Sequence, residues 1–201
     1  MFVTFEGLDG SGKSTQAGLL RARLERSGRE VVATREPGGT PVGEAVRELL
    51  LQGADMAPWA EATLFAAARA ELVEHVIRPA LDRGAWVVCD RYVDSSLAYQ
   101  GVARGLGVDE VLELNLRATG GVLPDRTFLL LVDPEVGIGR VGPRRDRIER
   151  EGAEFLGLVD RGYRELAERF SARIVALDGS ARPEEIAELV AASLAEHAGV
   201  S

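Results

Sequence analysis

The 201-residue sequence contains one cysteine and one lysine, and its formal net charge is −8. The single cysteine, Cys89, excludes a disulfide within the chain, and this usage favours a cytoplasmic protein. We find no apolar run of membrane-spanning length and no basic-then-apolar leader, so we expect no membrane association. The negative balance also argues against binding of polymeric nucleic acid, which requires a basic face.

A chain of this length with 46% apolar and 28% charged residues is typical of a globular protein with one core. It contains no internal repeat, linker or low-complexity tract. We therefore expect residues 1–201 to form a single domain.

Short apolar runs alternate with segments of helical periodicity along the chain. This alternation predicts an α/β fold, with a parallel sheet covered by helices on both faces. A proline within the long helical stretch, Pro79, should kink or restart it, and the three glycines of 101–107 indicate a mobile loop. The five expected strands are 2–6, 31–34, 86–90, 128–132 and 174–177. The expected helices are 13–25, one beginning at Pro41, 58–83, 93–99, 108–119, 134–140, 151–169 and 184–196.

The stretch from Gly7 to Ser14 matches G-x-x-x-x-G-K-[ST], the phosphate-binding loop of nucleoside-triphosphate enzymes. It lies between an expected strand and an expected helix, which is the setting that such a loop requires. Lys13, the only lysine, would reach the β- and γ-phosphates, and the Ser14 hydroxyl would bind Mg²⁺. The expected ATP-binding residues are Gly7, Leu8, Asp9, Gly10, Ser11, Gly12, Lys13, Ser14 and Thr15.

Other charged residues follow the neighbouring strands, at the edge of the sheet where ligands collect. Asp90 stands where a second Mg²⁺-organising carboxylate is needed, although it could instead cap the following turn. Three arginines, Arg35, Arg47 and Arg91, could bind a second phosphate through bidentate hydrogen bonds. For each of them the alternative is an ordinary surface charge.

Phe65 and Arg69 are four residues apart on one expected helix and so share a face. They could bind a base by stacking and hydrogen bonding, or Phe65 could be core and Arg69 a surface residue. Five arginines crowd the segment around 141–150, which could be a lid that closes over phosphates or a solvated face. In the lid interpretation, Asp146 and Glu149 pair with neighbouring arginines. The five are Arg140, Arg144, Arg145, Arg147 and Arg150.

A guanine-reading N-K-x-D motif cannot exist here, because the only asparagine, Asn115, is followed by Leu116. A large ATPase motor would need a longer chain. Among the classes of phosphate-loop protein, a compact kinase acting on a small acceptor remains. A kinase for another nucleoside monophosphate and a non-catalytic nucleotide-binding module are the alternatives.

Five segments together resemble the bacterial thymidylate kinases, and they occur in order over almost the whole chain. The resemblance implies the P-loop nucleoside-monophosphate-kinase fold, transfer of the ATP γ-phosphate to dTMP with Mg²⁺, and a homodimer formed through helices. The segments are 5–14, 34–40 (Thr-Arg-Glu-Pro-Gly-Gly-Thr), Asp90-Arg91-Tyr92 with Ser95 and Ser96, 98–101 (Ala-Tyr-Gln-Gly), and 146–149 (Asp-Arg-Ile-Glu).

The resemblance also implies roles for individual residues. Phe65 would stack on thymine, Arg69 would bind its O4, Ser96 and Gln100 would meet the rest of the pyrimidine edge, and Tyr99 would lie against the deoxyribose. The implied dTMP-binding residues are Asp9, Arg35, Glu36, Pro37, Arg47, Phe65, Arg69, Arg91, Ser96, Tyr99 and Gln100.

Gly10 stands where some relatives place a catalytic arginine, which implies that the lid supplies it. The short 141–143 segment leaves open whether Arg144 or Arg145 is that residue. Glu36-Pro37 is expected to be a cis peptide, as in the family. The implied catalytic residues are Asp9, Lys13, Arg91, Arg144 and Arg145.

Overall fold

The computed structural model describes residues 1–140 and 146–199. Its centre is a five-stranded sheet in the order β2-β3-β1-β4-β5, and every neighbouring pair is parallel. The expected α/β class and sheet are therefore confirmed, with β4 beginning two residues earlier than its apolar run. The strands are β1 (Phe2–Glu6), β2 (Val31–Arg35), β3 (Trp86–Asp90), β4 (Arg126–Leu131) and β5 (Ile174–Asp178).

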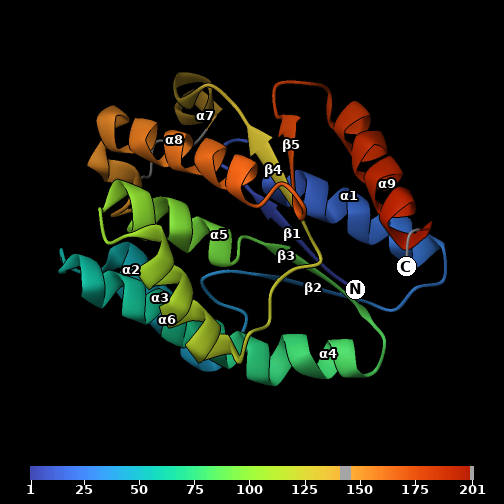
Figure 1. Ribbon diagram of the computed structural model, residues 1–201, viewed down its shortest axis with the longest axis horizontal. Helices are drawn as coiled ribbons and strands as arrows, with labels where there is room; N and C mark the ends of the chain where they lie inside the picture. Colours follow the sequence, from blue (N-terminus) through green and yellow to red (C-terminus); the bar gives the residue numbers. More distant parts are fainter. Residues whose placement is uncertain (141–145, 200–201) are drawn as a thin grey trace.

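Helices cover both faces of the sheet (Figure 1). On one face, α1 (Lys13–Arg26) and α9 (Pro183–Gly199) pack against β1, β3 and β4 through a cluster that includes Phe5, Leu20 and Val190. The larger core on the other face includes Phe2, Cys89 and residues of five helices. These are α3 (Pro58–Leu72), α4 (Arg78–Asp82), α5 (Val93–Ser96), α6 (Val108–Thr119) and α8 (Ala153–Arg169).

The remaining α-helices of the described residues are α2 and α7. Helix α2 (Pro41–Gln52) packs on α3 through Val46, Leu50 and Ala68. Thr40 caps its N-terminus by accepting a 2.9 Å hydrogen bond from the Gly43 N–H. Helix α7 (Pro134–Arg140) follows β4, and a 3₁₀ turn, η3 (Glu149–Glu151), precedes α8.

The expected helix 58–83 is continuous but changes its winding before Pro79. Helix α3 passes into a π-helical turn, η1 (Val73–Ile77), and then into α4, in which Pro79 is the second residue. Because proline has no N–H to donate and its ring crowds the preceding turn, a local change of winding is the usual accommodation.

The loop expected over 101–107 is shorter than the glycines suggested. A second π-helical segment, η2 (Leu97–Ala103), continues α5 and ends before Gly105. Helix α8 approaches η2 so closely that a Cβ at Gly162 would lie 3.0 Å from Val102 Cβ. This close packing of α8 favours the helical winding of η2 over the turn that the glycines suggested.

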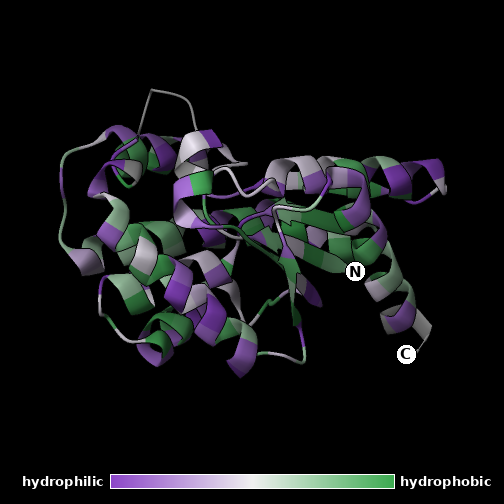
Figure 2. Ribbon diagram, turned by 90° about the horizontal axis from the view of Figure 1, so that it is seen from above, coloured by the Kyte–Doolittle hydropathy of each residue, from purple (hydrophilic) through white to green (hydrophobic). Residues whose placement is uncertain are grey.

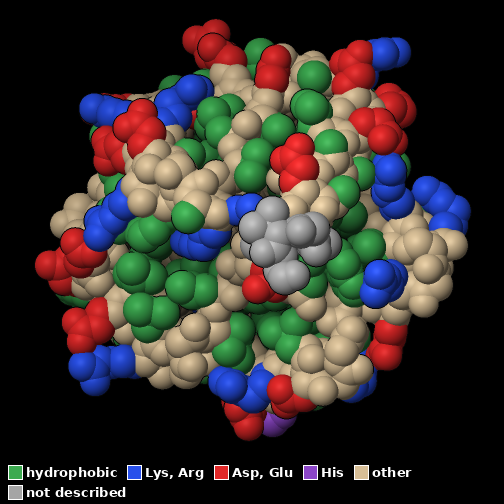
Figure 3. Space-filling model, turned by 45° about the vertical axis from the view of Figure 1, so that its right-hand side comes forward, with side chains coloured by type: hydrophobic (Ala, Val, Ile, Leu, Met, Phe, Trp, Pro, Cys, Tyr) green, Lys and Arg blue, Asp and Glu red, His purple; other side chains and the backbone are tan. Residues whose placement is uncertain are grey.

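The interior and the surface differ in polarity. Figure 2 shows apolar strands at the centre and polar residues on the outer sides of the helices. On the face in Figure 3, the acidic and basic side chains of the described residues are interspersed. Among the described residues, no helix combines the length and apolar character needed to cross a membrane.

Candidate active site

The phosphate loop joins β1 to α1 and adopts a conformation that only glycine tolerates at its first position. Gly7 has φ 135°, and a Cβ there would lie 2.3 Å from the Leu130 carbonyl oxygen. Lys13 begins α1, is 6% exposed, and donates a 2.8 Å hydrogen bond to the Leu8 carbonyl. Burial, assisted by the positive charge of Arg91, lowers the pKa of Lys13 to about 8. The loop thus holds a buried amine beside backbone N–H groups, as phosphate binding requires.

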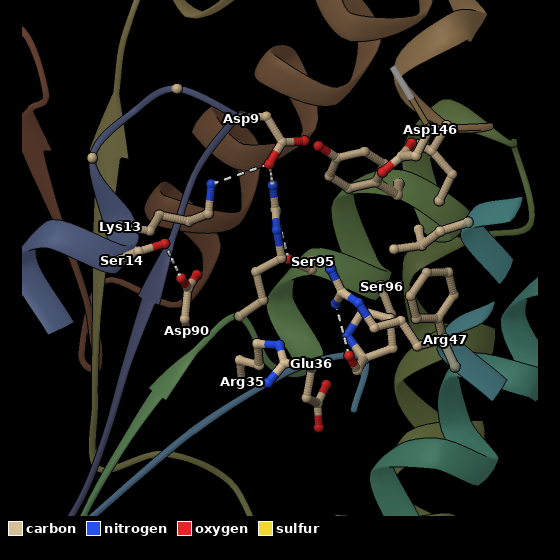
Figure 4. Close-up of a pocket in the computed structure, with 18 of the residues that line it drawn as sticks. Asp9, Lys13, Ser14, Arg35, Glu36, Arg47, Asp90, Ser95, Ser96 and Asp146 are labelled. Carbon is tan, nitrogen blue, oxygen red and sulfur yellow. Dashed lines mark hydrogen bonds and ion pairs between the residues drawn. The ribbon is translucent and has the colours of Figure 1, made fainter. Parts of the chain in front are cut away.

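Ser14 and Asp90 meet beside this loop, as Figure 4 shows. The Ser14 hydroxyl donates a 2.5 Å hydrogen bond to Asp90 Oδ2. Asp90 ends β3, which pairs with β1 in the register Phe5↔Asp90 and so brings the carboxylate to the phosphate loop. A hydroxyl and a carboxylate are hard oxygen ligands, and Mg²⁺ uses one or two of these with phosphates and waters. No group of three or more His, Cys, Asp or Glu residues that could hold a metal occurs in the described part of the chain. As hard oxygen donors beside a phosphate loop, the Ser14 hydroxyl and the Asp90 carboxylate fit Mg²⁺ bound together with phosphates.

Arg91 connects the phosphate loop with helix α5. It has a positive φ of 69°, unusual for a residue with a side chain, and its N–H donates to the Phe5 carbonyl over 2.9 Å. Its guanidinium donates to Asp9 Oδ1 over 2.7 Å and to Ser95 Oγ over 3.0 Å. Burial alone would raise the pKa of Asp9, but the charges of Arg91 and Lys13 outweigh it and hold that pKa well below its usual range. In the folded protein, Asp9 is therefore ionised at neutral pH.

A cavity of about 500 Å³ is lined by residues of the phosphate loop, by Arg91 and by Phe65. Arg35 reaches it from the end of β2, where it also donates to both carboxylate oxygens of Glu44. Arg47 is half-buried on α2 and donates a 2.8 Å hydrogen bond to the Pro37 carbonyl (Figure 4). The expected site residues that line this cavity are Asp9, Gly10, Gly12, Lys13, Ser14, Thr15, Arg35, Glu36, Pro37, Arg47, Phe65, Asp90, Arg91, Ser96, Tyr99 and Gln100.

Arg69 is neither on the cavity wall nor at the surface. Its side chain is 1% exposed and donates to Glu36 Oε2 over 2.7 Å and to Ser96 Oγ over 3.1 Å. It also donates to Asn115 and to the Tyr92 carbonyl. The interpretation of Arg69 as a surface residue is therefore wrong. It lies behind Glu36 and Ser96, both of which line the cavity.

The remaining expected positions are placed as follows. Gly7, Leu8 and Ser11 shape the phosphate loop without lining the cavity. The Glu36-Pro37 peptide is cis, as the resemblance implied. Arg144 and Arg145 lie outside the described residues. Within the same arginine-rich segment, Arg147 is 4% exposed and donates to Glu61 over 2.6 Å, so it is anchored in the body of the protein.

A buried carboxylate beneath Arg91 was not singled out from the sequence. Glu6 is fully buried and accepts hydrogen bonds from Ser95 Oγ over 2.6 Å and from the Tyr163 hydroxyl over 3.1 Å. Both hydroxyls also accept from Arg91. Burial, and after it the charge of Asp94, raises the pKa of Glu6 to about 7. The sequence signal for Glu6 is a charged residue at the end of the apolar run 2–6. No pattern in the sequence marks Tyr163.

The fold and site together define a P-loop nucleoside-monophosphate kinase: a phosphate loop on a five-stranded parallel sheet, facing an arginine-lined anion site across one cavity. The family model for thymidylate kinase matches residues 5–190. The chain belongs to the thymidylate kinase family, whose members phosphorylate dTMP to dTDP with ATP.

Individual relatives support this membership. The thymidylate kinase of Synechococcus sp. (strain JA-3-3Ab) is 50% identical over 187 residues, covering 93% of this chain and 91% of that one. The thymidylate kinase of Symbiobacterium thermophilum is 50% identical over 189 residues, covering 92% and 88%. A crystal structure of thymidylate kinase from Ehrlichia chaffeensis is similar with a TM-score of 0.75 and 36% identity, covering 88% and 91%.

Proposed function

We propose that this protein transfers the γ-phosphate of ATP to the phosphate of dTMP, giving ADP and dTDP. The observation that carries the proposal is one cavity, in a member of this family, that is lined by Lys13 of the phosphate loop, by Arg91 and by Phe65. A cavity that combines a phosphate loop, further arginines and an aromatic side chain suits two nucleotides bound with their phosphates meeting near Arg91.

The chemistry that these residues must support is an in-line displacement. A dTMP phosphate oxygen forms a bond to the γ-phosphorus, and the bond from that phosphorus to the β,γ-bridging oxygen breaks. The acceptor phosphate is already anionic, so positioning and charge stabilisation account for most of the catalysis. Lys13 and Arg91 supply that charge, and Asp9 orients Arg91 and approaches the 3′-hydroxyl of the acceptor sugar.

Ser14 and Asp90 would hold Mg²⁺, which neutralises charge on the β- and γ-phosphates when bound with ATP. At the other end of the cavity, Phe65 stacks on the thymine, while Ser96 and Gln100 contact its polar edge. Tyr99 lies against the deoxyribose. Arg69 supports this wall, since it is hydrogen-bonded to Ser96 and Glu36. Arg35 and Arg47 bind the dTMP phosphate.

We further propose a single cytoplasmic domain that assembles as a homodimer. Three large apolar side chains are exposed on the adjoining helices α2 and α3: Val42 (48%), Leu49 (55%) and Trp59 (47%). Such residues on neighbouring helices favour a protein interface. Sedimentation equilibrium of the purified protein tests this, and a monomer at all concentrations would exclude the dimer.

A coupled assay of ADP release tests the activity. ATP is supplied with dTMP, dUMP, CMP or AMP in turn, and we expect the highest kcat/KM with dTMP. Preference for another acceptor would assign a different nucleoside-monophosphate kinase. No turnover with any of the four would favour a nucleotide-binding module without catalysis.

A further inference from the structure

Glu61 is a buried carboxylate that underlies the base end of the cavity. It lies on α3, one turn before Phe65, and is 1% exposed. It does not line the cavity itself. Its position, four residues from the expected stacking ring on the same helix, places it beside the wall that meets the base.

The hydrogen bonds to Glu61 come from three side chains. Its Oε1 accepts from Gln100 Nε2 over 2.9 Å and from Arg104 Nε over 3.2 Å. Its Oε2 accepts from Arg147 Nη2 over 2.6 Å and from Arg104 Nη2 over 3.2 Å. These four bonds match the acceptor capacity of a carboxylate.

Glu61 is an anion in this setting. Burial would raise the pKa of Glu61, but the hydrogen bonds from Arg104, Gln100 and Arg147 outweigh it and leave the pKa lowered. An ionised carboxylate can only accept hydrogen bonds. The Gln100 side chain must therefore present its NH₂ group to Glu61, which settles the otherwise ambiguous orientation of a carboxamide.

With its nitrogen bound to Glu61, Gln100 has its oxygen left for a ligand in the cavity that it lines. A carbonyl oxygen is a hydrogen-bond acceptor. Thymine and uracil carry an N3–H donor, whereas cytosine has an unprotonated acceptor at N3. An acceptor facing an acceptor is left unpaired in a water-poor site, and such mismatches reject a ligand strongly.

We propose that Glu61 is a positioning residue for base selection: by binding the Gln100 nitrogen, it turns the carboxamide oxygen toward the base and favours pyrimidines with an N3–H over cytosine. The inference rests on the proposed function, since it assumes that Gln100 meets a pyrimidine. Glu61 acts through Gln100 and touches no substrate atom.

The test compares the wild type with Glu61→Gln, using dTMP, dUMP and dCMP as acceptors. A neutral amide at position 61 can donate or accept, so the Gln100 carboxamide is free to turn over. We expect the ratio of kcat/KM for dTMP to that for dCMP to fall by about tenfold or more. The dTMP-to-dUMP ratio should stay within about twofold, since both bases carry N3–H.

Two further variants separate positioning from a structural role. Arg104→Gln removes another partner of Glu61 and should keep the dTMP-to-dCMP ratio of the wild type. In a Gln100→Ala background, Glu61→Gln should not change the ratio. A folded Glu61→Gln enzyme with an unchanged ratio, or a further change without Gln100, would overturn the inference.

A measurement on the wild type keeps the inference testable if Glu61→Gln does not fold. In the ¹⁵N-labelled protein, the side-chain amide protons of Gln100 should exchange with water far more slowly than those of exposed Gln52. Equal exchange rates would overturn it. Absence of dTMP turnover by the wild type would instead refute the proposed function.

Discussion

The guanidinium of Arg91 and the carboxylate of Asp9 are joined by a 2.7 Å hydrogen bond from Nη2 to Oδ1. This contact connects the end of β3 to the phosphate loop, which lie 82 residues apart in the sequence. Asp9 also lies 3.7 Å from Lys13 Nζ. One carboxylate thus orders the two cations of the proposed phosphate site.

Arg91→Lys should therefore impair catalysis more than a loss of charge would suggest. Lysine keeps the positive charge but cannot contact Asp9, Ser95 and Tyr163 through one planar group. We expect kcat/KM for dTMP to fall by roughly 100-fold, the scale of losing one oriented charge donor. Steady-state kinetics with dTMP varied measures this, and near-normal activity would show that charge alone suffices.

Arg69→Ala should raise KM for dTMP with little effect on ATP, and should also destabilise the fold. The substitution leaves Glu36 buried without its cation, at a cost of roughly 3–5 kcal/mol. Urea denaturation measures the cost. Arg164→Ala breaks the exposed pair with Asp160 and should cost less than about 1 kcal/mol. In the kinetic assay, an equal rise in KM for dTMP and for ATP would exclude Arg69 from the base end of the site.

Glu6 should make the free energy of unfolding fall as pH rises from about 4.5 to about 7. Its pKa is raised from 4.5 to about 7 in the folded state. Between these values the folded chain holds a proton that the unfolded chain lacks, so the free energy of unfolding declines with pH, by up to about 1.4 kcal/mol per unit. Glu6→Gln should remove this slope, and exposed Glu113→Gln should retain it. Parallel wild-type and Glu6→Gln curves from pH 5 to 7 would contradict the assignment.

Arg144→Ala or Arg145→Ala should lower kcat while leaving both KM values nearly unchanged. An arginine that acts in the transition state contributes little to ground-state binding, and its loss should cost about 100-fold or more. Single-turnover kinetics distinguishes the two positions. Arg117→Ala, at an exposed site on α6, is the matched control. If neither lid variant slows turnover by more than a few-fold, the catalytic arginine lies elsewhere.

Much of the active site was predictable because its determinants are local. The phosphate loop is contiguous, and its flanking strand and helix are evident from periodicity within a few residues. The meeting of Ser14 with Asp90 followed from the rule that parallel strands end at one edge. The roles of residues within one helix, such as Phe65 and Arg69, were harder to predict. Helical periodicity assigns a residue to a face but does not show what that face contacts.

The buried ion pairs could not be predicted in this way. Arg69 and Glu36 are 33 residues apart, and Arg147 and Glu61 are 86 apart. Sequence pattern places an arginine by default at the surface, because an isolated buried charge is costly. The same reasoning places Arg147 among lid arginines, although it is anchored beside Glu61.

The sequence by itself determined the parallel sheet, the phosphate loop and the chemistry that Lys13, Ser14 and Asp90 offer, because each depends on residue order within one segment or on the ends of strands. The tertiary structure alone decided which charged side chains face the cavity and which support it from behind. Burial permits an arginine only where a distant carboxylate meets it, and that meeting is set by how the helices pack.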